Sequence, residues 1–158
     1  MYDSEHQCVH LAVVGGKRLE RWRRFARRIG IGSAVTFTGT VQDTVPYYAA
    51  ADAYVHPTFY DPCSLVLLEA AASGLPIVTT KRCNGVSELL RDEVDTLFVE
   101  DPTDTCALAA QIQVLLDDSV RRAMGKAARQ MALSHSFDRN VYELLAVYSE
   151  TSCCRHAA

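Results

Sequence analysis

The chain has 158 residues, which suits a single domain of ordinary size, and 49% hydrophobic with 22% charged residues is a normal globular balance. The formal net charge of −3 excludes a global positive field that would recruit nucleic acid, and no apolar run reaches the roughly 18 residues that span a bilayer. The first ten residues are polar and show no signal-peptide pattern, and the six cysteines form no C-x-x-C pair, so we expect a cytoplasmic protein with neither a zinc site nor a disulfide framework.

Five short apolar runs predict strands, and longer helical patterns separate them. The strands are expected at 10–16, 35–41, 53–58, 76–80 and 96–100. The helices are expected at 17–29, 45–51, 62–73, 85–91, 104–118, 119–134 and 137–151. The runs at 10–16 and 76–80 are the richest in apolar residues, so we expect both to be buried on both faces.

This alternation predicts an α/β fold, in which a Rossmann-like parallel sheet is flanked by helices and joined by right-handed crossovers. We expect one domain over 10–151, a leader over 1–9 and a loose tail over 152–158. In such folds ligands bind beyond the carboxyl ends of the strands. The residues at those ends are 15–17, 39–41, 59–64 and 81–85.

The most informative segment runs from His56 to Thr80 and reads HPTFYDPCSLVLLEAAASGLPIVTT. A strand is expected to end near Thr58, a loop to carry Asp61, and a helix to start near Pro62. The first helical N–H groups and the positive end of the helix dipole would form a site for phosphate oxygens. These N–H groups belong to Cys63, Ser64 and Leu65.

Two carboxylates frame that helix. Glu69 is expected about two turns into it, roughly 10 Å along the axis, where it can accept hydrogen bonds from ribose hydroxyls. Asp61, at the mouth, can accept hydroxyls from a sugar. The order of these groups matches a nucleoside diphosphate sugar.

Residues 61–78 resemble the E-x7-E region of family four of the retaining glycosyltransferases, which includes lipopolysaccharide core glucosyltransferases. The family pattern is roughly E-G-F-G-L-x-x-x-E-A-M-A-x-G-x-P-V-V, and this chain has DPCSLVLLEAAASGLPIV. Further similarity covers VVGG at 13–16, VTFTG at 35–39, NGVSE at 84–88 and the helices over 104–151. The resemblance implies the C-terminal half of a GT-B fold.

The resemblance also implies roles for individual residues. Glu69 matches the glutamate that holds the ribose, and Asp61 takes the place of the glutamate that faces the donor sugar. The other donor-binding residues implied are Cys63, Ser64 and Leu65 at the phosphates or hexose, Gly15 and Gly16 at a strand end, and Thr40 and Val41 at the base. Asp61 is one methylene shorter than the usual glutamate, which leaves the donor sugar open.

Structural explanations compete with several of these roles. An Asp-Pro pair is typical of a helix N-cap with proline at the first position, so the alternative is that Asp61 caps the helix, which need not exclude sugar contact through its second oxygen. Glycines such as Gly15 and Gly16 also simply end strands. We expect His56 to be structural, Cys63 not to be a catalytic thiol, and Lys81 and Arg82 to be solvated rather than bound to an anion.

The helix expected at 17–29 has seven basic residues and one acid, Glu20. Leu19, Trp22, Ala26 and Ile29 recur at helical spacing, which is typical of a stripe that faces the core. The alternative is peripheral contact with an anionic membrane at its inner face.

The family resemblance predicts an enzyme that transfers a hexose from UDP or another nucleoside diphosphate to an acceptor hydroxyl, without a metal cofactor, in cell-surface glycan or lipopolysaccharide synthesis. The family's C-terminal domain opens with a strand–helix unit, and we expect this unit to be missing here, because no counterpart precedes residue 10. We therefore expect the chain to need an N-terminal GT-B domain, in cis or in trans, and to be inactive alone. The alternatives are a non-catalytic nucleotide-sugar-binding or regulatory module, and a sugar-nucleotide epimerase of the same fold.

Overall fold

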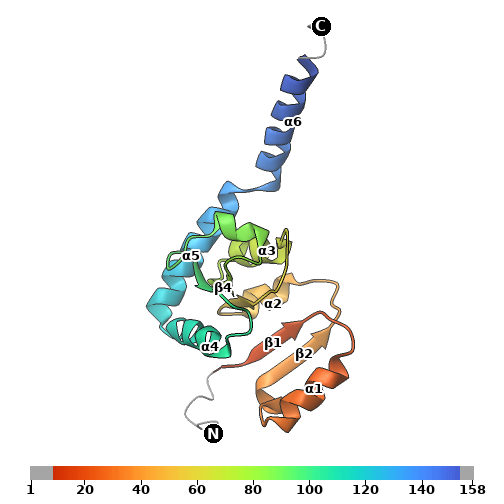
Figure 1. The fold of residues 1–158 in the computed structure, drawn as a ribbon, viewed down its shortest axis with the longest axis vertical. Helices are drawn as coiled ribbons and strands as arrows, with labels where there is room; N and C mark the ends of the chain where they lie inside the picture. Colours follow the sequence, from red (N-terminus) through yellow and green to blue (C-terminus); the bar gives the residue numbers. More distant parts are fainter. Residues whose placement is uncertain (1–8, 154–158) are drawn as a thin grey trace. The chain divides into compact units, whose positions relative to one another are not determined.

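The computed structural model describes residues 9–153, and these divide into two compact units, one up to Ala50 and one from Ala51. Helices and strands alternate along the chain as far as β5 (Thr96–Val99), and the helices over 105–153 follow it in succession (Figure 1). Each unit is described by itself below. The single domain expected over 10–151 stays a prediction. The tail expected from 152 lies almost wholly outside the described residues.

The first unit contains a parallel pair of strands, β1 (Leu11–Val14) and β2 (Val35–Gly39). Between them lie α1 (Leu19–Arg28) and a short 3-10 helix, η2 (Gly32–Ala34), and α2 (Val45–Ala50) follows β2. The strands and helices lie where the sequence predicts them. The expectation that the first strand is buried on both faces is wrong, because Leu11 is 49% and Val14 is 37% exposed.

The second unit contains a parallel sheet in the order β3-β4-β5, formed by Tyr54–His56, Ile77–Thr80 and Thr96–Val99. The central strand β4 is buried along its whole length, as its sequence predicts. Its register is fixed by pairs such as His56 with Thr79 and Thr79 with Phe98.

The helices that pack against this second sheet are α3 (Leu65–Ala72), α4 (Thr105–Val114) and α5 (Asp118–Ser134). A 3-10 helix, η3 (Gly85–Leu89), replaces the helix expected at 85–91. The last helix, α6 (Phe137–Cys153), is exposed over 137–151. Successive β4 residues point to opposite sides. Ile77 therefore packs with Leu67 and Ala128 in one apolar cluster, and Val78 packs with Leu115 and Met124 in another.

The sequence places α3 too early. Its start was expected near Pro62, but the helix begins at Leu65 with Ser64 as its N-cap. The reason is that the Asp61 carbonyl accepts a hydrogen bond from the Gly85 N–H at 3.0 Å, so it is engaged outside the helix. A turn over 62–63 then separates Asp61 from α3.

Candidate functional site

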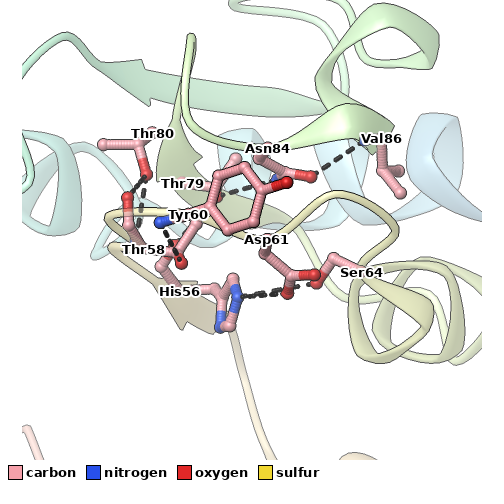
Figure 2. A network of polar contacts seen from close by, with 9 residues as sticks. All are labelled: His56, Thr58, Tyr60, Asp61, Ser64, Thr79, Thr80, Asn84 and Val86. Atoms are coloured by element: carbon pink, nitrogen blue, oxygen red, sulfur yellow. Dashed lines mark hydrogen bonds and ion pairs between the residues drawn. The ribbon is translucent and has the colours of Figure 1, made fainter.

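The loop that joins β3 to α3 brings three polar side chains together. His56 Nε2 lies 3.2 Å from Asp61 Oδ2 and 3.5 Å from Ser64 Oγ (Figure 2). His56 is the last residue of β3, and Ser64 is almost fully buried at the start of α3. The carboxylate of Asp61 is therefore held between the end of a strand and the start of a helix.

The Asp61 carboxyl group has a lowered pKa. A hydrogen bond from the Ser64 hydroxyl is the largest cause, and it is opposed by desolvation. Hydrogen bonds from His56 and from the Cys63 N–H lower the pKa further. Asp61 is thus an ionised hydrogen-bond acceptor, which is the form that can bind sugar hydroxyls.

The backbone of Asp61 is fixed as firmly as its side chain. The Asp61 N–H donates to the Cys83 carbonyl at 2.8 Å, and the Gly85 N–H donates to the Asp61 carbonyl. These bonds form a bridge between Asp61 and Asn84. A methyl group on Gly85 would overlap the Pro62 carbonyl oxygen, so the two segments touch at a position that only glycine permits.

Buried polar side chains behind the loop join it to β4. The Thr79 hydroxyl donates to the His56 carbonyl at 2.8 Å, and Asn84 Nδ2 donates to Thr79 Oγ1 at 3.3 Å (Figure 2). The Asn84 side-chain oxygen accepts from the Val86 N–H at 2.9 Å and so caps η3. The Thr80 hydroxyl donates to the Thr58 carbonyl at 2.6 Å. Because buried polar groups are costly to leave unpaired, this network specifies one arrangement of the loop.

Glu69 belongs to the same neighbourhood. The pKa of Tyr54 is raised to about 12, first by burial and then by the negative charges of Glu69 and Asp61. The phenol of Tyr54 therefore lies close enough to both carboxylates to interact with them electrostatically. Glu69 is exposed, and it is four residues into α3, which is about 6 Å along the axis rather than the two turns expected.

The helix start differs from its expected form in two further ways. Asp61 is not the N-cap, so the capping interpretation of this residue is wrong. The Leu65 N–H donates to the Cys63 carbonyl at 2.9 Å, and the Cys63 N–H is directed at Asp61. Two of the three N–H groups expected at a phosphate are thus engaged within the loop.

The remaining predicted residues lie in the first unit. Gly15 and Gly16 have φ angles of 91° and 85°, a region that favours glycine, and the Gly15 N–H donates to the Gly39 carbonyl at 2.8 Å. Thr40 is exposed and Val41 is half-buried in the segment after β2. The donor-binding roles of these four residues stay predictions.

Lys81 and Arg82 are exposed, as expected, and form ion pairs with Glu100 at 3.7 and 3.6 Å. Cys63 is a free and exposed thiol, and the expectation that it is not catalytic stays a prediction.

The sequence reasoning missed Tyr54 and His56 as members of the site. Their signal is their spacing, since alternate residues of a strand share a face and both rings here lie near the carboxylates. The two rings are stacked, with centroids 6.0 Å apart.

Residues 9–153 contain neither a candidate metal centre nor a candidate membrane span. No group of three or more His, Cys, Asp or Glu side chains in this range is arranged to hold a metal ion. No helix in this range has the length and apolarity needed to cross a membrane.

Comparison with known proteins shows the family of the chain. Residues 3–118 match the family described as "Glycosyl transferases group 1". The chain is 38% identical over 128 residues to D-inositol 3-phosphate glycosyltransferase of Salinispora tropica, covering 79% of this chain and 26% of that protein. It is 30% identical over 122 residues to lipopolysaccharide glucosyltransferase WaaG of Escherichia coli K12, covering 77% of this chain and 30% of that protein.

Among solved structures, Anabaena Alr3699/HepE in complex with UDP and glucose superposes with a TM-score of 0.76 at 22% identity, covering 89% of this chain and 42% of that chain. This likeness concerns the fold. Together with other GT-B neighbours it confirms the expected α/β class, with parallel sheets flanked by helices. The chain spans less than a third of the length of the two curated relatives described above.

Proposed function

Because the chain belongs to the glycosyl transferases group 1 family, we propose that it is the donor-binding half of a retaining hexosyltransferase. The observation that carries this proposal is the ionised Asp61 carboxylate, fixed by His56 and Ser64 beyond the carboxyl end of β3. This is the place where ligands bind in α/β folds. Glu69, on the helix that follows, supplies the second acceptor.

In the proposed reaction, a nucleoside diphosphate hexose lies with its ribose at Glu69 and its sugar at Asp61. The bond between the anomeric carbon and the diphosphate oxygen breaks, and the acceptor oxygen takes its place on the same face of the ring. The acceptor hydroxyl proton leaves with the diphosphate. Asp61 orients the hexose as a hydrogen-bond acceptor and does not attack the anomeric carbon. We propose that no metal ion takes part.

The relatives suggest the process in which the chain acts. WaaG is named as a lipopolysaccharide glucosyltransferase, so we propose a role in cell-surface glycan or lipopolysaccharide synthesis on the cytoplasmic side of a membrane. The further chain of the relatives would supply an N-terminal domain that binds the acceptor. A non-catalytic nucleotide-sugar-binding module is the alternative, and it predicts donor binding without transfer.

An exposed face of α1 favours contact with an anionic membrane. Trp22 and Phe25 are 49% and 43% exposed, and their rings meet edge to face. The guanidinium groups of Arg21 and Arg28 each lie 5.2 Å from one of these ring centroids. Aromatic rings with arginines beside them match the boundary between lipid headgroups and acyl chains.

Calorimetric titration of the chain with pairs of ligands tests the donor-binding proposal. The pairs are UDP with UDP-glucose and GDP with GDP-mannose, each measured with EDTA and with Mg²⁺. We expect one nucleotide sugar to bind more tightly than its nucleoside diphosphate, with equal affinity in EDTA and in Mg²⁺. A chain that binds none of the four ligands does not have this function.

A further inference from the structure

The donor-binding role proposed for Asp61 does not explain why His56 contacts its carboxylate. Its Nε2 atom is within hydrogen-bonding distance of Asp61 Oδ2, at 3.2 Å, and both side chains are 26% exposed. Figure 2 shows the imidazole and the carboxylate pointing toward each other, with Ser64 beyond them. His56 thus contacts the carboxylate from the end of β3.

The imidazole is itself anchored. The His56 backbone pairs with Thr79 of the central strand, and its carbonyl accepts a hydrogen bond from the fully buried Thr79 hydroxyl. Asn84 in turn donates to that hydroxyl. The ring stacks on Tyr54, with an interplanar angle of 16°. The nitrogen that faces Asp61 is therefore held by the sheet.

The Asp61 carboxylate receives hydrogen bonds from two directions. Ser64 and the Cys63 N–H donate from the start of α3, and His56 donates from the end of β3. Donors on one side only would leave the carboxylate free to turn toward the helix. Donors on both sides fix its plane, and the plane decides which sugar hydroxyls its oxygens can accept.

We propose that His56 is a positioning residue, which orients the Asp61 carboxylate for the donor sugar and so sets the sugar part of donor affinity. This inference rests on the proposed function. It predicts that changes at His56 act on the nucleotide sugar and spare the nucleoside diphosphate, because the proposed complex has the hexose at Asp61 and the ribose at Glu69.

Two variants of similar polarity separate positioning from general damage. His56→Gln keeps an N–H donor near the Nε2 position, and the shorter side chain of His56→Asn does not reach Asp61. The quantity measured is the ratio of the UDP Kd to the UDP-glucose Kd, or of the GDP pair if that pair shows the larger ratio. We expect His56→Asn to lower this ratio about tenfold, the effect of one hydrogen bond to a charged group. His56→Gln should stay within about threefold of the wild type.

Two controls complete the experiment. His135→Asn removes an imidazole that contacts Ser134 and the Met131 carbonyl on α5, and it should leave the ratio unchanged. In a double-mutant cycle, Asp61→Asn should lower the ratio, and adding His56→Asn should lower it no further, because both changes remove the same contact. Circular-dichroism melting of every variant shows that it is folded.

The outcomes separate this inference from the proposed function. A wild type that binds nucleotide sugar, with a ratio unchanged in His56→Asn or with additive effects in the cycle, overturns the positioning role alone. A loss of UDP binding equal to the loss of UDP-glucose binding also overturns it. A wild-type ratio near one for both pairs overturns this inference and the donor-sugar role of Asp61 together.

Discussion

Neighbours within one short loop keep the Asp61 carboxylate ionised. The Ser64 hydroxyl is buried at the N-cap of α3, yet it makes no capping hydrogen bond and turns to Asp61 instead. Because the folded-state pKa of Asp61 lies below the ordinary value of 3.8, its contribution to stability is complete above that value. The contribution is lost as the pH falls through the folded-state pKa.

Replacing Ser64 tests this cause directly. We expect Ser64→Ala to raise the pKa of the Asp61 carboxyl group, since the variant removes the donor with the largest effect. An NMR titration of the side-chain carboxyl carbons measures the shift. Ser119→Ala is a matched control, because Ser119 lowers the pKa of Asp117 in the same way at the start of α5. If the Asp61 pKa is the same in Ser64→Ala and in Ser119→Ala, Ser64 is not the cause.

Glu69 carries the second prediction about a single side chain. Glu69→Ala should weaken binding of both the nucleotide sugar and its nucleoside diphosphate by about tenfold or more, since hydrogen bonds to a charged acceptor contribute about 1.5–3 kcal/mol each. Calorimetric titration measures both affinities. Glu143→Ala removes a similar carboxylate from an exposed helix position and should change neither. Unchanged affinity in Glu69→Ala would remove the ribose assignment.

A close contact between two backbone segments holds the loop that carries Asp61 in its position. Gly85 begins η3 and meets the Pro62 carbonyl oxygen without room for a side chain. Gly125 in α5 meets the Gly74 carbonyl oxygen in the same way, at the end of α3. Both glycines therefore allow a close backbone contact within the second unit, Gly85 with the loop that carries Asp61 and Gly125 with the end of α3.

Alanine at each glycine distinguishes stability from site geometry. Overpacking costs about 1–3 kcal/mol, so both variants should melt several degrees lower. Gly85→Ala should also reduce the affinity for nucleotide sugar relative to nucleoside diphosphate, because the overlap displaces the loop that carries Asp61. Gly125→Ala should keep the wild-type preference. Equal preference in the two variants would show that this contact does not place Asp61.

The exposed face of α1 gives a prediction for a whole helix. Changing Arg21, Arg24 and Arg28 to Gln should abolish salt-sensitive sedimentation with vesicles of anionic lipid, because the helix loses its attraction to the headgroups. Changing Arg122, Lys126 and Arg129 to Gln makes the same change in net charge on exposed positions of α5. Equal sedimentation of the two triple variants would exclude α1 as the contact.

The chain covers 26% and 30% of the length of the two curated relatives described above. This partial coverage leads to a prediction about the activity of the chain alone. We expect the chain to bind a donor alone but to transfer or hydrolyse it only with an N-terminal GT-B domain, because the proposed chemistry needs an acceptor site as well. Mixing the chain with the N-terminal half of WaaG should raise its melting temperature and release UDP from UDP-glucose. Asp61→Asn in the same mixture is the control. A chain that is monomeric and active on its own would contradict this expectation.

Residues 76–80 and 61–78 show how much the sequence determined. The apolar run at 76–80 predicted a buried central strand, and the motif over 61–78 predicted the family, because both depend on residue types that are close together in the chain. The positions of the strands within residues 9–153 followed from the same kind of local pattern. The exposure of β1, in contrast, depends on what packs against it, and its apolar sequence predicted the opposite.

Only the tertiary structure decided the details of the candidate site. The hydrogen bond from Gly85 to Asp61 joins residues 24 positions apart. Because this bond engages the Asp61 carbonyl, α3 begins at Leu65 and not at Pro62, where the sequence predicts its start. The contact of His56 with Asp61 likewise depends on the path of the loop after β3, which returns Asp61 to the end of that strand. The sequence determined which residue types were available, because local patterns specify strands and helices. Tertiary hydrogen bonds decided which side chains meet, because they join segments whose separation along the chain has no periodic signature.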